Sequence, residues 1–189
     1  MEVEKPEFEV MLDLETMGVD YNAAVVSIGA VKFNPRGAIG VLGNPKQENY
    51  QHFYRTILLQ SLSENDFKFD GNTVAFWLGQ DEETRKALLA NAQPLDTVLS
   101  AFWEWYGPTS VPTWGNGAGF DNVILRNAFV KLAGLCPFKF YHDRCYRTLR
   151  SLFPDVQYVK PALAHHALQD AEAQAIHLQK LFNRINFSG

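Results

Sequence analysis

The hydrophobic pattern of this chain changes period part-way along, and that change constrains the fold most. In residues 8–15 every second side chain is apolar, which is the two-residue period of a β-strand. Residues 25–33 form a β-branched run and residues 52–57 a further strand-like run, with turn-rich segments between them. These three strands, joined by two hairpins, are expected to form an antiparallel unit.

The second part of the chain has helical spacing instead. Helices are expected at residues 73–79, 82–91, 95–106, 121–132, 144–153 and 166–185, with a short buried strand at 111–114. Strands first and helices later, with one strand among them, predict a mixed α/β domain built on one central sheet. No internal repeat or linker-like stretch divides the chain, so residues 1–189 are expected to form a single domain.

Composition excludes several classes of protein. With 189 residues, of which 47% are hydrophobic, the chain can bury its own core, which argues against a disordered or low-complexity protein. No apolar run approaches the roughly 20 residues that a bilayer span needs, and the acidic start is unlike a signal peptide. We therefore expect a soluble, cytoplasmic protein with no membrane partner.

Net charge and cysteine content further limit the classes of protein to which this chain could belong. The net charge of −4 gives no global basic field of the kind that draws a protein onto duplex nucleic acid. It leaves open an enzyme that handles a nucleic-acid end, because carboxylates that hold divalent cations supply positive charge locally. Cys136 and Cys145 lie in no metal-binding pattern, so they are expected to be reduced thiols.

Two acids in the first strand suggest a metal site. Asp13 and Glu15 are two residues apart, so their carboxylates project from one face of the strand, about 6.6 Å apart along the backbone. Like charges on an otherwise apolar strand repel each other unless a cation lies between them. A hard metal ion with oxygen ligands is the simplest such cation.

Two further clusters lie at helix starts. Asp121 follows a glycine-rich segment whose G-x-G-x-G spacing does not match a dinucleotide-binding loop, and it would lie in the first turn of a helix. His165 precedes Asp170 by five residues, and a histidine in the preceding loop can lean over a cavity that Asp170 enters. Taken alone, each cluster also has a structural interpretation, as a helix-start acid or a helix cap.

Taken in order, the three clusters resemble the exonuclease motifs of the DEDD superfamily of 3′-to-5′ exonucleases. The matching motifs are Asp13-Leu14-Glu15-Thr16, Asn116-x-x-x-Phe120-Asp121 and His165-x-x-x-x-Asp170. The sister branch of the superfamily has tyrosine four residues before the last aspartate, where this chain has His166, so the resemblance is to the histidine-bearing branch. The opening motif and the compact size are also similar to the subgroup of RNase AS-type and exodeoxyribonuclease VIII-like proteins.

The resemblance implies a fold and an activity. The fold would be a ribonuclease-H-like three-layer α/β fold, in which helices flank a central mixed sheet of antiparallel N-terminal strands and parallel strands. The activity would be metal-dependent hydrolysis of single-stranded RNA or DNA from the 3′ end, releasing nucleoside 5′-monophosphates with two Mg²⁺ or Mn²⁺ ions.

The resemblance also implies a role for each motif residue. Asp13 would bridge both ions, Glu15 and Asp170 would complete the nucleophile-side metal, and Asp121 would hold the leaving-group-side metal through water. His165 would accept the proton of the attacking water.

Substrate contacts are expected beside these residues. Thr16, Met17 and Gly18 follow Glu15 and could meet the terminal nucleotide, while Phe120 and Trp77 could stack on bases, although packing in the core is the more common fate of such aromatic residues. Asn116 is a further candidate. Four arginines are either phosphate contacts or part of a solvated helix face: Arg126, Arg144, Arg147 and Arg150.

Two rival functions stay open at this point. One is a ribonuclease-H-like module that binds nucleic acid or protein without cutting it, and the other is a phosphoesterase acting on small nucleotides. Four acids and a histidine in motif order favour the exonuclease, because a binding module gains nothing from so many repelling groups. The choice between RNA and DNA and the oligomeric state are left undetermined, with a homodimer suggested by analogy alone.

Overall fold

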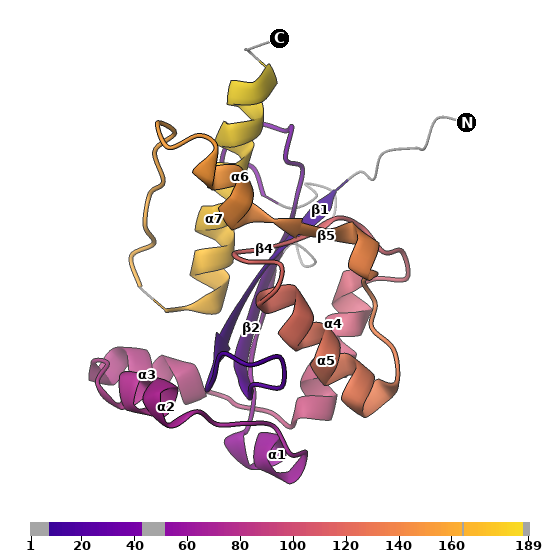
Figure 1. Cartoon of the computed structure of the whole chain (residues 1–189), viewed down its shortest axis with the longest axis vertical. Coiled ribbons are helices and arrows are strands. Elements are labelled where there is room, and N and C mark those ends of the chain that lie inside the picture. The colour runs from indigo at the N-terminus through magenta and orange to yellow at the C-terminus, as the bar shows by residue number, and fades with distance from the viewer. Residues whose placement is uncertain (1–7, 43–51, 164, 187–189) are drawn as a thin grey trace.

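The computed structural model describes residues 8–42, 52–163 and 165–186 of the chain. Through its centre runs a five-stranded sheet in the order β3-β2-β1-β4-β5 (Figure 1). The strands are β1 (Glu9–Thr16), β2 (Val25–Phe33), β3 (His52–Thr56), β4 (Thr113–Gly115) and β5 (Asp143–Cys145). β1, β2 and β3 pair antiparallel, whereas β4 runs parallel to β1 and β5 parallel to β4, which confirms the expected mixed sheet.

The helices follow the predicted pattern with two corrections. They are α1 (Leu59–Glu64), α2 (Gly71–Leu78), α3 (Glu82–Leu89), α4 (Leu95–Tyr106), α5 (Asp121–Ala133), α6 (Tyr146–Ser151) and α7 (Ala167–Asn186), with a 3₁₀ turn at Phe140–His142. The expected helix at 144–153 begins later, because Asp143–Cys145 pairs with β4 as an edge strand. α1 was not expected, since six residues are too few to show a helical period.

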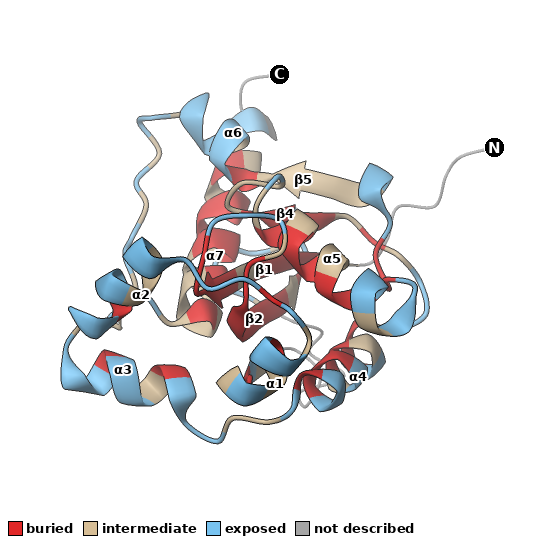
Figure 2. Ribbon diagram, turned by 60° about the horizontal axis from the view of Figure 1, so that its bottom comes forward, coloured by how far each residue is buried: buried red, intermediate tan, exposed pale blue. Residues whose placement is uncertain are grey.

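Helices cover both faces of the sheet. The even-numbered apolar residues of β1, such as Leu12, pack with α4 and α5 in one core cluster. Met11, on the opposite face, packs with Tyr146 of α6 and with the apolar stripe of α7. Figure 2 shows the buried residues gathered along the strands and on the sides of α5 and α7 that face them. The expected three-layer arrangement is therefore confirmed.

The alternation of β1 fixes where its acids point. Asp13 and Glu15 share the odd-numbered face with Met11, so they point toward α7 and away from α4 and α5. Helices α1, α2 and α3 lie together at one end of the sheet (Figure 1). Across the described ranges, no helix combines the length and apolarity that crossing a bilayer requires.

Candidate active site

Three acids from two elements meet on the α7 face of the sheet. β1 supplies Asp13 and Glu15, and the first turn of α7 supplies Asp170. One carboxylate oxygen from each lies within 4.8 Å of those of the other two. Asp13 and Asp170 are half-buried, and Glu15 is only 8% exposed. The structure thus brings together the acids of the first and third sequence motifs.

A glycine lets α7 come this close. Gly29 on β2 lies directly opposite Asp13 in the strand pairing. A Cβ atom at Gly29 would lie 2.1 Å from the carbonyl carbon of Ala167 and 2.2 Å from the backbone nitrogen of Leu168. The start of α7 therefore rests on the backbone of β2, and this contact places Asp170 beside Asp13.

A second glycine places the fourth acid. Gly115 ends β4, and a Cβ atom there would lie 2.4 Å from Oδ1 of Asn122 and 3.0 Å from Cβ of Asp121. The backbone N–H of Leu14 donates to Oδ1 of Asp121 at 3.2 Å, which ties the start of α5 to β1. Asp121 is 3% exposed. Gly115, the first glycine of the glycine-rich segment, thus allows the start of α5 to approach β4 closely.

The four acids line one cavity of about 320 Å³, which we call the inner cavity. It opens between β1, the start of α5, α6 and the start of α7. Its lining also includes Asn116, Phe120, Arg147, Arg150, Tyr158, His165 and Gln174. Every acid of the three sequence motifs therefore faces the same cavity.

Burial and mutual repulsion raise the pKa values of these acids. Burial, followed by the charges of Asp121, Glu15 and Asp170, raises the pKa of Asp13 well above its usual range. Burial, followed by the charges of Asp170 and Asp121, raises the pKa of Glu15 to about 8. The pKa of Asp121 rises to about 7 through burial, although backbone N–H groups that donate to its carboxylate oppose the rise. At neutral pH the cluster therefore needs protons or cations to balance its charge.

The donor set fits a hard divalent cation. The acids offer carboxylate oxygens alone, which suit Mg²⁺ or Mn²⁺, whereas zinc sites usually draw on histidine or cysteine. Gln174 supports this assignment, since its Nε2 donates to Oδ1 of Asp13 at 2.8 Å while its Oε1 has no hydrogen-bond partner among the described residues. That buried oxygen is a free acceptor next to the acids. Asp13, Glu15 and Asp170 therefore form a cluster of the type that holds such cations, and Asp121 lines the same cavity.

An aromatic wall supports His165. His165 has a backbone φ of 60°, and its ring meets the rings of Phe76 and Trp77 edge-on, with centroids 5.2 Å and 5.8 Å away. The indole N–H of Trp77 donates to the carbonyl oxygen of Thr16 at 2.9 Å, and Trp77 is only 5% exposed. Trp77 is thus a buried support for His165 and for the segment after Glu15, not an open surface for a base.

The neighbouring His166 lies differently. Its ring stacks on Tyr54 of β3, with centroids 4.3 Å apart and planes 23° from parallel. It is not among the residues that line the inner cavity, whereas His165 is. Of the two adjacent histidines, His165 is therefore the one that faces the acids.

The remaining expected substrate contacts divide into two groups. Asn116 and Phe120 line the inner cavity and are half-buried. The segment of Thr16, Met17 and Gly18 is buried next to it, where the Thr16 hydroxyl donates to the Gly18 carbonyl at 2.6 Å. Residues 16–18 therefore stabilise the end of β1 and do not line the cavity.

The four arginines also divide. Arg147 and Arg150 on α6 line the inner cavity. Arg126 forms an ion pair with Asp143, and Arg144 donates to nearby backbone carbonyls. The α6 pair is therefore the part of the arginine prediction that the structure brings to the site.

Sequence analysis missed two polar residues of the cavity, Gln174 and Tyr158. Gln174 lies four residues after Asp170, so helical spacing placed it on the same face and could have revealed it. Tyr158 comes from the irregular segment before α7, which has no period to interpret.

A family model described as "3'-5' exoribonuclease Rv2179c-like domain" matches residues 8–182. The chain belongs to this family of 3′-5′ exoribonuclease domains. Its match spans all the strands of the sheet and the acids of the inner cavity. No curated protein sequence matches the chain significantly.

Solved structures of other nucleases share the fold of this exoribonuclease domain. Exonuclease I of E. coli in a complex with single-stranded DNA has a TM-score of 0.60 at 14% identity, covering 97% of this chain and 43% of its own. Exonuclease X in complex with 5′-overhanging duplex DNA has a TM-score of 0.54 at 17% identity, covering 94% and 93%. The nuclease domain of 3'hExo, a DEDDh family member, bound to rAMP, has a TM-score of 0.57 at 10% identity, covering 97% and 95%.

These similarities establish a ribonuclease-H-like exonuclease fold. The chain spans less than half the length of exonuclease I, so it corresponds to one part of that enzyme. The expected similarity to the DEDD exonucleases is confirmed for the fold, because a DEDDh family member is among these structures.

The raised pKa values predict how stability depends on pH without metal. A carboxyl group whose pKa is higher in the folded than in the unfolded chain stabilises the fold fully below its unfolded pKa and loses that effect as pH rises through its folded pKa. For Glu15 this window runs from its ordinary value of 4.5 to about 8. In EDTA we expect Tm to fall by about 10 °C between pH 5 and pH 8.5.

The matched control is Glu15→Gln, which removes one titrating group and should reduce the fall in Tm. Excess Mg²⁺ should reduce it as well, because cations replace the missing protons. Thermal unfolding at several pH values measures both effects. A Tm that rises with pH in EDTA would contradict the pKa shifts.

Proposed function

We propose that this domain removes nucleotides one at a time from the 3′ end of single-stranded RNA, releases nucleoside 5′-monophosphates, and uses two Mg²⁺ or Mn²⁺ ions. The observation that carries the proposal is the convergence of Asp13, Glu15, Asp121 and Asp170 on one cavity in an exoribonuclease family member. The relatives support it, because one was solved with single-stranded DNA and another with rAMP.

The residues of the cavity have separable roles in this proposal. The charges of all three other acids act on Asp13, so Asp13 would bind both ions. Glu15 and Asp170 together would complete the site of one ion, and Asp121 would complete the site of the other. When bound, the ions neutralise charge on the attacking and leaving oxygens and lower the pKa of the attacking water. Gln174 holds Asp13 in place through its amide.

His165 would accept the proton of the attacking water. It lines the inner cavity, and its left-handed backbone together with the edges of Phe76 and Trp77 directs its ring there. Histidine is the side chain best suited to accept a proton near neutral pH.

His165→Ala is therefore expected to lower kcat by about 10²- to 10⁴-fold. Mn²⁺ binding should change little, because His165 is not among the acids that would hold the ion. The measurements are kcat from pH 6 to 9 and the shift of Tm caused by Mn²⁺. His166→Asn is the matched control, since His166 stacks on Tyr54 outside the cavity and should be dispensable for turnover. Full turnover of His165→Ala across this pH range would remove His165 from the mechanism.

The test of the proposed function uses 5′-labelled single-stranded RNA and DNA of the same sequence, in Mg²⁺, Mn²⁺ or EDTA. We expect a metal-dependent ladder that shortens from the 3′ end, faster on RNA than on DNA. A 3′-phosphorylated RNA serves as the control for attack at the 3′ end and should be degraded more slowly. Intact oligonucleotides under every condition, with a folded protein, would favour a binding module or a small-nucleotide phosphoesterase.

A further inference from the structure

A second cavity adjoins the inner one. It has a volume of about 580 Å³ and lies between α6 and residues 153–160, and we call it the outer groove. Asn116, Arg147, Arg150 and Tyr158 line both the inner cavity and the outer groove. The two spaces are therefore continuous, and a chain-like ligand that enters one can extend into the other.

The outer groove carries positive charge. Arg147, Arg150 and Lys160 contribute to its lining, which includes no aspartate or glutamate. Arg147 and Arg150 are three residues apart on α6, so they share one face of that helix. The inner cavity, by contrast, is lined by four acids. A chain with a net charge of −4 thus places three cations next to its acidic site.

One of these cations is held in place. The guanidinium of Arg150 lies over the ring of Tyr158, 4.8 Å from its centroid. Tyr158 in turn meets His177 edge-on at 5.6 Å. His177 is fixed at both nitrogens, because Nε2–H donates to the carbonyl of Val156 at 2.9 Å and Nδ1 accepts from the Tyr146 hydroxyl at 2.8 Å. These contacts hold the Arg150 guanidinium in one position, so it is preorganised to bind an anionic ligand.

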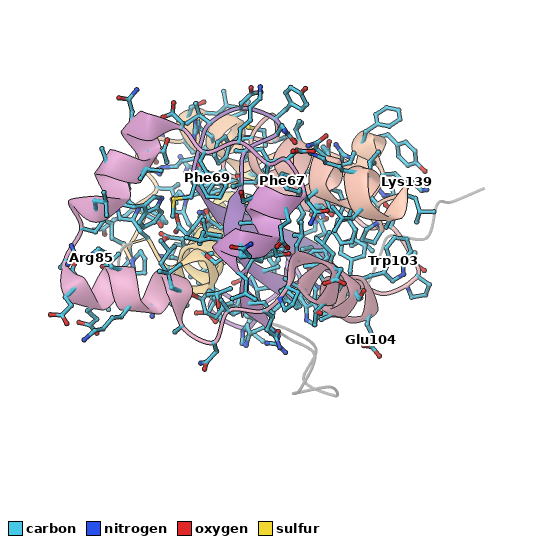
Figure 3. All side chains as sticks on the ribbon, turned by 90° about the horizontal axis from the view of Figure 1, so that it is seen from below. Phe67, Phe69, Arg85, Trp103, Glu104 and Lys139 are labelled. Carbon is cyan, nitrogen blue, oxygen red and sulfur yellow. The ribbon has the colours of Figure 1, made fainter. Side chains whose placement is uncertain are left out.

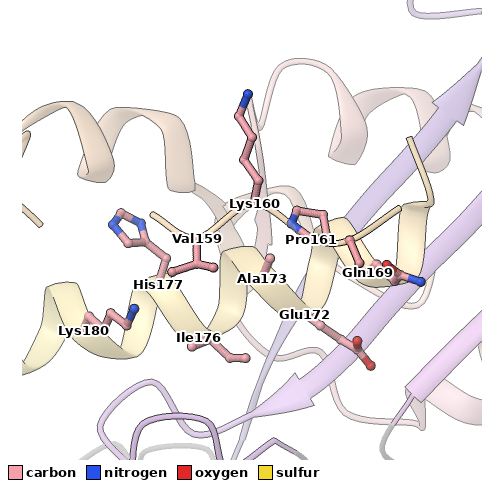
Figure 4. A pocket seen from close by; sticks show the side chains of 10 residues that line it. Val159, Lys160, Pro161, Gln169, Glu172, Ala173, Ile176, His177 and Lys180 are labelled. Atoms are coloured by element: carbon pink, nitrogen blue, oxygen red, sulfur yellow. The ribbon is translucent and has the colours of Figure 1, made fainter. Parts of the chain in front are cut away.

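Other cavities are less suited to an anionic strand. The cavity between α4 and α5, of about 540 Å³, is rimmed by Asp96 and Glu104, and Figure 3 shows Trp103 and Glu104 projecting from α4. The cavity on the outer side of α7 includes Lys160 in its lining, but Figure 4 shows the Lys160 ammonium pointing away from Ala173 and the helix. The ammonium group of Lys160 is therefore available to a ligand in the outer groove, which Lys160 also lines.

We propose that the outer groove binds the part of the RNA strand that precedes the 3′-terminal nucleotide, with Arg150 and Lys160 contacting its phosphates. This inference rests on the proposed function. The terminal nucleotide would occupy the inner cavity, and the strand would leave it past Tyr158. Guanidinium and ammonium groups bind phosphate strongly, and a strand that approaches four acids needs such contacts before its end reaches them.

The test compares a dinucleotide with a hexanucleotide RNA of the same base. A dinucleotide would place its 3′ nucleotide in the inner cavity and only one nucleoside beyond it, whereas the hexanucleotide would extend along the outer groove. We use Arg150→Ala and Lys160→Ala, and leave out Arg147 because its charge also lowers the pKa of Asp121. Arg55→Ala is the control, since Arg55 is an exposed arginine on β3 that lines neither space.

In each of the two variants, the ratio of kcat/KM for the hexanucleotide to kcat/KM for the dinucleotide should fall about tenfold, mainly through KM. The slope of log KM against log salt should decrease by about 0.7 for each lost phosphate contact. Arg55→Ala should leave both quantities unchanged. A ratio and slope equal to those of the wild type in both variants would overturn the proposal.

Binding separates this inference from the proposed function. Fluorescence anisotropy of a labelled hexanucleotide RNA, measured in EDTA, reports strand binding without cleavage. Weaker binding by Arg150→Ala and Lys160→Ala than by Arg55→Ala supports strand binding in the outer groove. It does so even if the wild type cleaves neither RNA, because absence of cleavage would reject only the proposed exonuclease activity. Equal binding by all variants would reject the groove.

Discussion

Asp13→Asn is expected to lower RNA hydrolysis by about 10³-fold or more and at the same time to raise the Tm of the metal-free domain. The activity falls because Asp13 lies among Glu15, Asp121 and Asp170 and is the acid assigned to both cations. The stability rises because asparagine has the same shape and replaces a half-buried carboxyl group that, when ionised, repels those three acids. It also keeps an oxygen that can accept from Gln174.

The measurements for Asp13→Asn are kcat on single-stranded RNA in Mg²⁺ and thermal unfolding in EDTA at pH 8. We expect Tm to rise by a few degrees. Glu104→Gln is the matched control, because Glu104 is exposed on α4 and outside the acid cluster, so both quantities should stay near wild type. Turnover of Asp13→Asn within tenfold of wild type, or a lower Tm in EDTA, would contradict the role given to Asp13.

Gly29→Ala is expected to weaken both the fold and the activity, although Gly29 carries no functional group. Its Cβ would lie 2.1 Å from a backbone carbon of Ala167, and backbone cannot turn aside as a flexible side chain can. The start of α7 must then move, and Asp170 moves with it. Overpacking of this kind costs about 1–3 kcal/mol, which corresponds to roughly 2–12 °C in Tm for a domain of this size.

The activity of Gly29→Ala should fall by about 10²-fold, the effect expected when a catalytic group shifts by about 1 Å. Thermal unfolding and kcat are measured together with Mn²⁺ affinity, which should also weaken. Gly71→Ala is the control, because a Cβ atom there would meet nothing within 4 Å. If Gly29→Ala has the Tm and kcat of the wild type, the contact between β2 and α7 does not position Asp170.

Local sequence pattern was sufficient for much of the fold and site. The alternation of β1 placed Asp13 and Glu15 on one face, and the structure shows both facing α7. Asp121 and Asp170 were predicted because each is the last residue of a short sequence motif at the start of a helix. These features depend on residues close together in the chain, where two-residue and helical periods are visible.

Features that depend on distant pairing were not predictable in this way. The importance of Gly29 arises from its register opposite Asp13 and from the packing of α7 onto β2, neither of which leaves a local pattern. β5 has three half-buried residues and shows no period. Trp77 was a candidate for base stacking, but an aromatic residue in a sequence carries no sign of its exposure, and the structure buries it behind His165.

The central claim is that the four acids of the inner cavity form a site for divalent cations. Titration calorimetry of Mn²⁺ into the metal-free domain at pH 7.5, in two buffers of different ionisation enthalpy, tests it most directly. We expect two ions per chain and release of protons, because Glu15 and Asp121, with pKa values of about 8 and about 7, must lose their protons when an ion binds. Asp13→Asn should weaken this binding severely. Absence of binding to the folded wild type, or binding that Asp13→Asn leaves unchanged, would contradict the claim.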